Sequence, residues 1–178
     1  MVYQLMSDAS YLSRPRARSV AGWLAYFGDA YTINGPVAYA SKMIDCVVAS
    51  VAEAELGSAF MSAQRAVQHR NTLADFGYPQ PPTLLRIDNT IALGLADNKL
   101  NRKRSKSMDM PYFWLTDRVR QGHFRVEHIA GKHNIADHFT KTLPKQIFEV
   151  FVLFLMVNLD TVPKRLRTKT QTITMPKL

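Results

Sequence analysis

Residues 50–76 read SVAEAELGSAFMSAQRAVQHRNTLADF, a stretch that is rich in alanine and free of proline. Its apolar residues recur at intervals of three and four, as they do along one face of an α-helix. Gly77 and Pro79 follow the stretch, and these two residue types commonly end a helix. The stretch therefore predicts one long helix, before and after which the other elements can be placed.

Three apolar segments precede this helix, and each has the length and composition of a β-strand. They are residues 2–7, 18–27 and 36–43. Asn34 and Gly35 lie just before the third segment, and an Asn-Gly pair is a strong turn signal. We therefore expect an antiparallel meander of three strands, with a turn around Asn34-Gly35.

The sequence after the long helix alternates between predicted strands and predicted helices. The strands are residues 83–87 and 123–129. The helices are residues 89–96, 109–121, 134–142 and 145–159, with Pro111 in the first turn of the second and Gly122 at its end. This order predicts an α/β domain with a five-stranded mixed sheet: the three-strand antiparallel meander plus two further strands, flanked by helices.

Composition narrows the class of protein. The chain has 178 residues, which is the size of one domain, and 47% of them are hydrophobic, which argues against wholesale disorder. No apolar run reaches the roughly 18 residues of a membrane span, so we expect no membrane partner. Cys46 is the only cysteine, which excludes an internal disulfide and a cysteine-based zinc site. Because no secretory signal is visible either, we expect an intracellular protein of the cytoplasm or nucleus.

The formal net charge of +9 is concentrated in two basic clusters. The first consists of Lys99, Arg102, Lys103, Arg104 and Lys106. Such a cluster suits a polyanion, of which nucleic acid is the commonest, although a solvated loop is the simpler alternative. The second lies in residues 161–178, which lack periodicity and are predicted to be a flexible basic tail.

Four acidic residues occupy positions where reactive groups collect in α/β sheets, at strand ends and helix starts. Asp8 follows the first predicted strand, Glu55 lies early in the long helix, Asp88 ends the fourth strand, and Asp137 lies in the helix after the fifth. Hard divalent cations prefer oxygen ligands, so this set predicts a two-metal site for phosphodiester hydrolysis. The simpler alternatives are a turn residue at Asp8, a helix cap at Asp88 and a surface acid at Asp137.

Glu53 and Glu55 compete for the helix position in this set. Residues two apart on a helix point about 200° away from each other, so only one of them can face the sheet. Leu56, Ala59 and Ala63 share the side of Glu55. We therefore assign the site to Glu55 and expect Glu53 to be exposed or to cap the helix near Ser50.

Five segments carry a resemblance to a known family. They are Ser7-Asp8-Ala9-Ser10, Arg18-Ser19-Val20-Ala21-Gly22-Trp23, Ser50-Val51-Ala52-Glu53-Ala54-Glu55-Leu56, Ile87-Asp88-Asn89-Thr90-Ile91-Ala92-Leu93 and Ala136-Asp137-His138-Phe139-Thr140-Lys141. In this order they resemble the ribonuclease H domain of copia-type LTR retrotransposon Pol polyproteins, over about residues 3–143. The chain departs from that family at Leu56, usually a tyrosine, and at Ser107, usually a histidine, and Tyr112-Phe113-Trp114 replaces the family's Tyr-His-Phe.

The resemblance implies a ribonuclease H-like fold in residues 1–143, followed by a C-terminal apolar helix in residues 144–160 and the basic tail in residues 161–178. It also implies that Asp8, Glu55, Asp88 and Asp137 bind two Mg²⁺ ions, for which Mn²⁺ can substitute. His128 corresponds to the family's loop histidine better than His133 does, and it would assist proton transfer or product release.

The activity implied by the resemblance is cleavage of the RNA strand of RNA/DNA hybrids. Ser10, Asn34, Asn89 and Thr90 would contact 2′-hydroxyls, although each could equally serve a turn or a cap, and the first basic cluster would hold phosphates. A partner would be the reverse transcriptase domain of the same polyprotein. No polymerase, integrase or protease signature occurs in the chain, so we expect an excised or solitary domain. A catalytically silent nucleic-acid-binding or assembly module with the same fold is the alternative, and the departures in residues 105–114 favour it.

Overall fold

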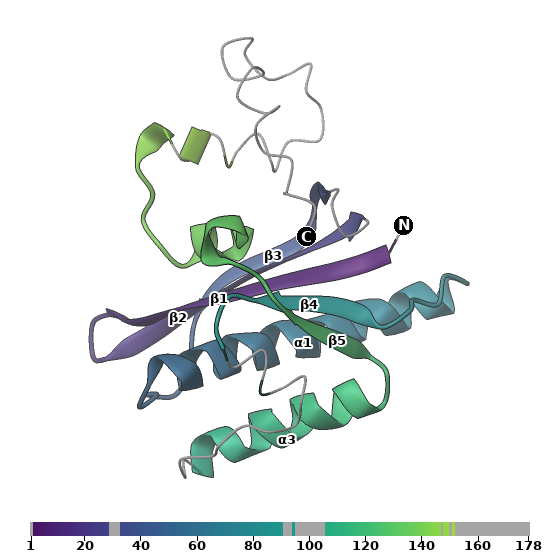
Figure 1. Ribbon diagram of the computed structural model, residues 1–178, viewed down its shortest axis with the longest axis horizontal. Helices are drawn as coiled ribbons and strands as arrows, with labels where there is room; N and C mark the ends of the chain where they lie inside the picture. The colour runs from purple at the N-terminus through teal and green to yellow at the C-terminus, as the bar shows by residue number, and fades with distance from the viewer. Residues whose placement is uncertain are drawn as a thin grey trace.

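A five-stranded mixed sheet is the centre of the computed structural model, which describes residues 2–28, 33–90, 94, 106–146, 148–149 and 151, without the side chains of residues 33–34 and 106–108. The strands are β1 (Val2–Arg14), β2 (Arg18–Gly28), β3 (Ile33–Met43), β4 (Thr83–Ile87) and β5 (Phe124–His128). Their order is β3-β2-β1-β4-β5 (Figure 1). The first three pair antiparallel, β4 pairs parallel with β1, and β5 pairs parallel with β4. The predicted mixed sheet is confirmed.

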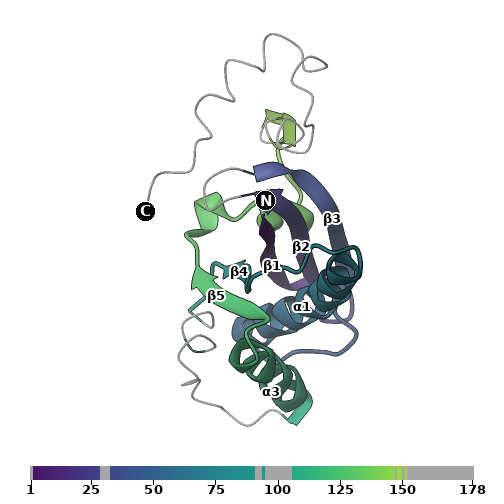
Figure 2. The ribbon, with the colours of Figure 1, turned by 90° about the vertical axis from the view of Figure 1, so that its right-hand side faces the viewer.

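Two helices, α1 (Val51–Asp75) and α3 (Lys106–Arg120), cover one face of the sheet (Figure 2). The Ser50 side chain accepts a hydrogen bond from the Glu53 N–H at 3.2 Å, and Glu53 Oε2 accepts one from the Ala49 N–H at 2.8 Å. Reciprocal capping of this kind satisfies the free amides at the start of a helix. The predicted capping role of Glu53 is therefore confirmed.

The central strands of the sheet are buried on both faces. Tyr3, Leu5 and Ala9 of β1 pack with the apolar side of α1. Met6, between them on the same strand, belongs to a second apolar cluster with Leu24, Tyr26, Ile135, Ala136 and Phe151. Because successive side chains of a strand point to opposite faces, β1 separates two cores and has few exposed positions.

Two boundaries in the meander differ from the prediction. Strand β1 does not end at Ser7, because it pairs with β2 through Ser10 opposite Val20 and resumes at Arg14 opposite Arg18, which places Asp8 inside the strand. The predicted turn at Asn34-Gly35 is wrong, since both residues lie in β3. The register there jumps from Phe27–Asn34 to Tyr26–Pro36, so Gly35 is an extra residue on an edge strand, where a bulge is readily accommodated.

The segment after β5 differs more. Residues 131–133 form a short 3-10 helix, η1 (Gly131–His133), and the segment 134–142, predicted as one helix, contains only a second short one, η2 (Ile135–Phe139). Asn134 separates them, because its Oδ1 accepts a hydrogen bond from the Ala136 N–H at 3.2 Å and so caps η2. The second short helix lies on the sheet face opposite α1 (Figure 1).

Helix α3 begins at Lys106, three residues before the predicted start, and ends as expected before Gly122, which has φ 73°. The predicted helices at residues 89–96 and 145–159 lie mostly outside the described residues, as do the first basic cluster and the basic tail. Phe151 is described and is buried against His138 and Phe139. Within the described part of the chain, no helix has the length and apolar character needed to cross a membrane.

Candidate metal centre

Three of the four predicted acids converge at one edge of the sheet. Each of Asp8, Glu55 and Asp88 offers a carboxylate oxygen, and the three oxygens lie within 4.8 Å of one another. The parallel pairing of β1 with β4 ends at Ser7 opposite Ile87. Asp8 and Asp88 are the next residues of the two chain segments, so they follow the last pair side by side. Glu55 reaches the same point from the start of α1. The carboxylate of Glu55 thus lies in the cluster, whereas that of Glu53 accepts a hydrogen bond from the Ala49 N–H.

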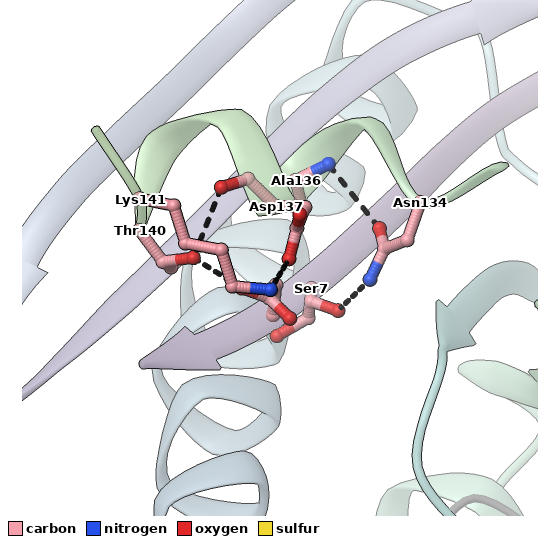
Figure 3. A network of polar contacts seen from close by, with 7 residues as sticks. Ser7, Asn134, Ala136, Asp137, Thr140 and Lys141 are labelled. Atoms are coloured by element: carbon pink, nitrogen blue, oxygen red, sulfur yellow. Dashed lines mark hydrogen bonds and ion pairs between the residues drawn. The ribbon is translucent and has the colours of Figure 1, made fainter. Parts of the chain in front are cut away.

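Asp137 lies beside this trio rather than within it. It is part of η2, and its negative charge raises the pKa values of Asp8 and Asp88, which places it close to both. The Lys141 ammonium donates a hydrogen bond to Asp137 Oδ1 (Figure 3). The structure therefore brings the four acids to one place, with three in direct proximity and the fourth paired to a lysine.

Polar contacts to β1 hold η2 over the carboxylates. The Thr140 hydroxyl donates to Asp8 Oδ2, and Asn134 Nδ2 donates to the Ser7 carbonyl at 3.0 Å (Figure 3). From the other side of the sheet, the Ser58 hydroxyl of α1 donates to the Asp8 carbonyl at 2.7 Å. Asp8 is thus fixed through its backbone and its side chain, as ligands of a metal site usually are by their outer neighbours.

Burial sets the electrostatics of the trio. Burial, followed by the charges of Asp8 and Asp88, raises the pKa of Glu55 to about 8. Burial also raises the pKa of Asp8 to about 6, with smaller contributions from Asp137 and Asp88, although the Thr140 hydrogen bond opposes the shift. The pKa of Asp88 is raised by burial and by Asp137. Such a site favours any partner that neutralises negative charge.

The burial of the Glu55 carboxylate is a further indication that the trio can hold a divalent cation. Glu55 is only 4% exposed, and its Oε2 has no hydrogen-bond partner among the described residues. A buried carboxylate oxygen without a partner is costly, and the Glu55 carboxylate belongs to a group of oxygen atoms of the kind that Mg²⁺ prefers. Gly131 leaves space beside the Asp88 carboxylate, because a Cβ at this position would lie only 3.1 Å from Asp88 Oδ2.

The chain is similar in sequence to transposon Pol polyproteins, whereas no family model matches it. The Pol polyprotein of transposon TNT 1-94 from Nicotiana tabacum is 28% identical over 133 residues, which are 75% of this chain and 10% of the relative. That of transposon RE2 from Arabidopsis thaliana is 28% identical over 134 residues, which are 75% of this chain and 9% of the relative. The chain thus spans about a tenth of the length of the relatives that it matches.

Solved structures supply the fold. LC11-RNase H1 in complex with an RNA/DNA hybrid aligns with a TM-score of 0.55 at 11% identity, covering 77% of this chain and 92% of that one. The protease-reverse transcriptase of prototype foamy virus aligns with a TM-score of 0.53 at 13% identity, covering 78% of this chain and 20% of that one. The chain has the ribonuclease H fold and is related to transposon Pol polyproteins. The resemblance found in the five sequence segments is therefore confirmed.

The other predicted site residues of this ribonuclease H-like domain lie in different places. His128 ends β5, and its Nε2 is 3.1 Å from the backbone oxygen of Asp88 rather than from a carboxylate. Asn89 and Thr90 directly follow Asp88, and the Thr90 hydroxyl donates to Asn89 Oδ1 at 3.3 Å. Ser10 is half-buried on β1, two residues beyond Asp8. The side chains of Asn34, Lys99, Arg102, Lys103, Arg104 and Lys106 lie outside the described residues.

Three residues beside the carboxylate cluster carry no role in the sequence-based prediction. Asn134 and Thr140 bind β1, and Lys141 binds Asp137. Thr140 and Lys141 belong to the segment that resembles the family ending, which was the available signal. Nothing in that segment alone indicates that Thr140 contacts Asp8, 132 residues away in the chain.

Without divalent cations, the stability of the domain is expected to fall as pH rises from about 4.5 to about 8. Glu55 has a pKa of about 8 in the folded protein and an ordinary value of 4.5, so the folded state binds more protons than the unfolded chain in this window. Asp8 adds to the effect between 3.8 and about 6. Urea unfolding in a chelating buffer at several pH values measures the slope. A Glu55→Gln variant should show a flatter profile, and an unchanged slope in that variant would contradict the assignment.

Proposed function

We propose that this domain is a metal-dependent ribonuclease H that cleaves the RNA strand of RNA/DNA hybrids. The observation that carries the proposal is the convergence of the Asp8, Glu55 and Asp88 oxygens, with Glu55 Oε2 buried and without a hydrogen-bond partner in the described part of the chain. Four carboxylates in one place repel one another, and burial makes that repulsion costly. Cations that neutralise them would both complete the site and supply its chemistry.

Asp8, Glu55 and Asp88 would hold one Mg²⁺, and Asp8 with Asp137 a second, with Mn²⁺ as a substitute. When bound, such a pair of ions lowers the pKa of the attacking water and stabilises the leaving 3′ oxygen. The protein's own contribution is positional. Thr140 orients the Asp8 carboxylate, and Asn134 keeps η2 against β1. His128 is held at the Asp88 backbone, from where its ring would accept or return a proton at the edge of the site.

The substrate class is inferred from similarity and charge. LC11-RNase H1 is described in complex with an RNA/DNA hybrid, and this chain carries a net charge of +9, which suits a polyanion. Ser10, Asn89 and Thr90 lie next to the metal ligands in sequence and are our candidates for contacts to 2′-hydroxyls, together with Asn34. The basic cluster at residues 99–106 is the candidate phosphate contact.

A polymerase neighbour is part of the proposal. The sequence relatives are Pol polyproteins of which the chain spans about a tenth, and one structural neighbour is a protease-reverse transcriptase. We infer that the domain works beside the reverse transcriptase domain of the same polyprotein, which would present the hybrid to the carboxylates.

The test is cleavage of a hybrid labelled on both strands by the purified chain. We expect Mg²⁺-dependent cutting of the RNA strand only, no cutting in chelator, and a loss of at least about a hundredfold in the Asp88→Asn variant. Duplex DNA and single-stranded RNA are the control substrates. Cleavage by the natural chain no faster than by Asp88→Asn would contradict the proposal, and hybrid binding without cleavage would support the catalytically silent module.

A further inference from the structure

Lys141 is a positive charge built into the carboxylate cluster. Its ammonium donates a hydrogen bond to Asp137 Oδ1, and its side chain remains 53% exposed. Its charge also lowers the pKa values of Asp8, Glu55 and Asp88, in addition to its hydrogen bond to Asp137.

The ammonium lies on the side of the cluster that holds Asp137, the acid with which it is paired. Asp8, Glu55 and Asp88 approach one another within 4.8 Å, and Asp137, which is paired with Lys141, lies outside that group. An ammonium on Asp137 weakens the attraction of the site for a dication, because the two positive charges repel each other at short range. A lysine side chain is flexible and half of this one meets solvent, so it can leave at low cost.

We propose that Lys141 is a tethered cation that occupies the Asp137 side of the site and is displaced when a divalent cation binds. The proposal rests on the cation site of the proposed function. Lys141 is then a positioning residue. In the absence of metal, its ammonium keeps Asp137 near the trio. When a cation binds, the free energy needed to displace the ammonium lowers the affinity of the site. After displacement, its ammonium is free for a phosphate of the bound nucleic acid.

Removal of the ammonium tests the proposal through binding rather than activity. Lys141→Met should bind Mn²⁺ about three- to tenfold more tightly than the natural chain in titration calorimetry, because one repelling charge is gone. Lys42→Met is the matched control. Lys42 is similarly exposed and pairs with Asp45 at 3.6 Å, three residues along the chain. Its variant should bind Mn²⁺ as the natural chain does. Equal or weaker binding by Lys141→Met would overturn the proposal.

A second measurement uses the natural chain, so it does not depend on the variant folding. Acetylation by acetic anhydride, followed by mass spectrometry, should modify Lys141 faster with saturating Mn²⁺ than without it, while the rate at Lys42 stays constant. An unchanged or slower rate at Lys141 would overturn the proposal. Absence of any Mn²⁺ binding would overturn the proposed function as well, whereas binding with no difference between Lys141→Met and the natural chain would overturn this inference alone.

Discussion

Asp8→Asn is expected to reduce metal-dependent cleavage of the RNA strand on the order of a thousandfold. Asp8 stands at the centre of the carboxylate cluster: it is 2% exposed, it belongs to the trio of Asp8, Glu55 and Asp88, and Asp137 acts on it electrostatically. An amide has almost the same shape but carries no charge, so it loses the attraction for divalent cations. The measurement is the single-turnover cleavage rate at saturating Mg²⁺.

The same substitution should leave the fold intact, which separates a chemical loss from unfolding. The pKa of Asp8 is raised to about 6, so its ionised form is disfavoured in the folded protein. Without metal at pH 8, Asp8→Asn should therefore unfold at the same urea concentration as the natural chain or at a higher one. Asp45→Asn makes the same chemical change on a side chain that is 83% exposed, and it should cleave normally. Cleavage by Asp8→Asn within about tenfold of the natural rate would remove Asp8 from the mechanism.

The fold was largely predictable because its main signals are local. The capping residue Ser50, the apolar spacing of α1 and the φ 73° stop at Gly122 each act within a few residues of where they are read. Strand β4 was predicted with its observed bounds, Thr83–Ile87, because a short apolar run between polar turns has few other interpretations.

The secondary-structure predictions are wrong where contacts with residues distant in the sequence determine the local conformation. Asn34-Gly35 is a turn signal in isolation, but pairing with β2 keeps both residues in β3 and absorbs Gly35 as the extra residue of a bulge. Strand β1 continues past Ser7 because β2 supplies partners as far as Arg14. Residues 134–142 have helical spacing, but the side chain of Asn134 bonds to β1 and to the backbone of Ala136, and the segment forms only the 3-10 helix η2.

The candidate site shows the same division. The three clustered acids were predicted because the sequence placed each of them near the end of a strand or the start of a helix, although Asp8 lies inside the longer strand β1. The supporting contacts were not predicted, because they join segments that only the tertiary structure brings together, as Ser58 of α1 does with the Asp8 carbonyl. Lys141 is a further example. A separation of four residues from Asp137 predicts an ion pair only if the segment is an α-helix, but here the pair joins Asp137 of the 3-10 helix η2 to a residue beyond its end.

Gly22→Ala is expected to destabilise the domain by about 1–3 kcal/mol and to weaken cleavage together with it. Gly22 lies opposite Asp8 in the β1–β2 pairing, beneath η2. A Cβ at this position would lie 2.6 Å from Thr140 Cγ2, 2.9 Å from Phe139 Cβ and 3.0 Å from the Ala136 carbonyl oxygen. Because one of these atoms belongs to the backbone, η2 itself must move. That movement carries Thr140 away from Asp8 and Asp137 away from the trio.

Gly57→Ala is the matched control, since it makes the same change at a buried glycine inside α1. Its Cβ would lie 3.5 Å from Ile44 Cδ1, an ordinary van der Waals contact, so the helical preference of alanine should stabilise the domain by about 0.5–1 kcal/mol. Urea unfolding and Mn²⁺ titration of both variants decide the matter. If Gly22→Ala unfolds like the natural chain and binds Mn²⁺ normally, the prediction is wrong. Close packing of η2 over β2 is then not what holds Asp137 in place. If Mn²⁺ binding falls only in Gly22→Ala, the absence of one methyl group on β2 is what allows η2 to bring the fourth carboxylate to the other three.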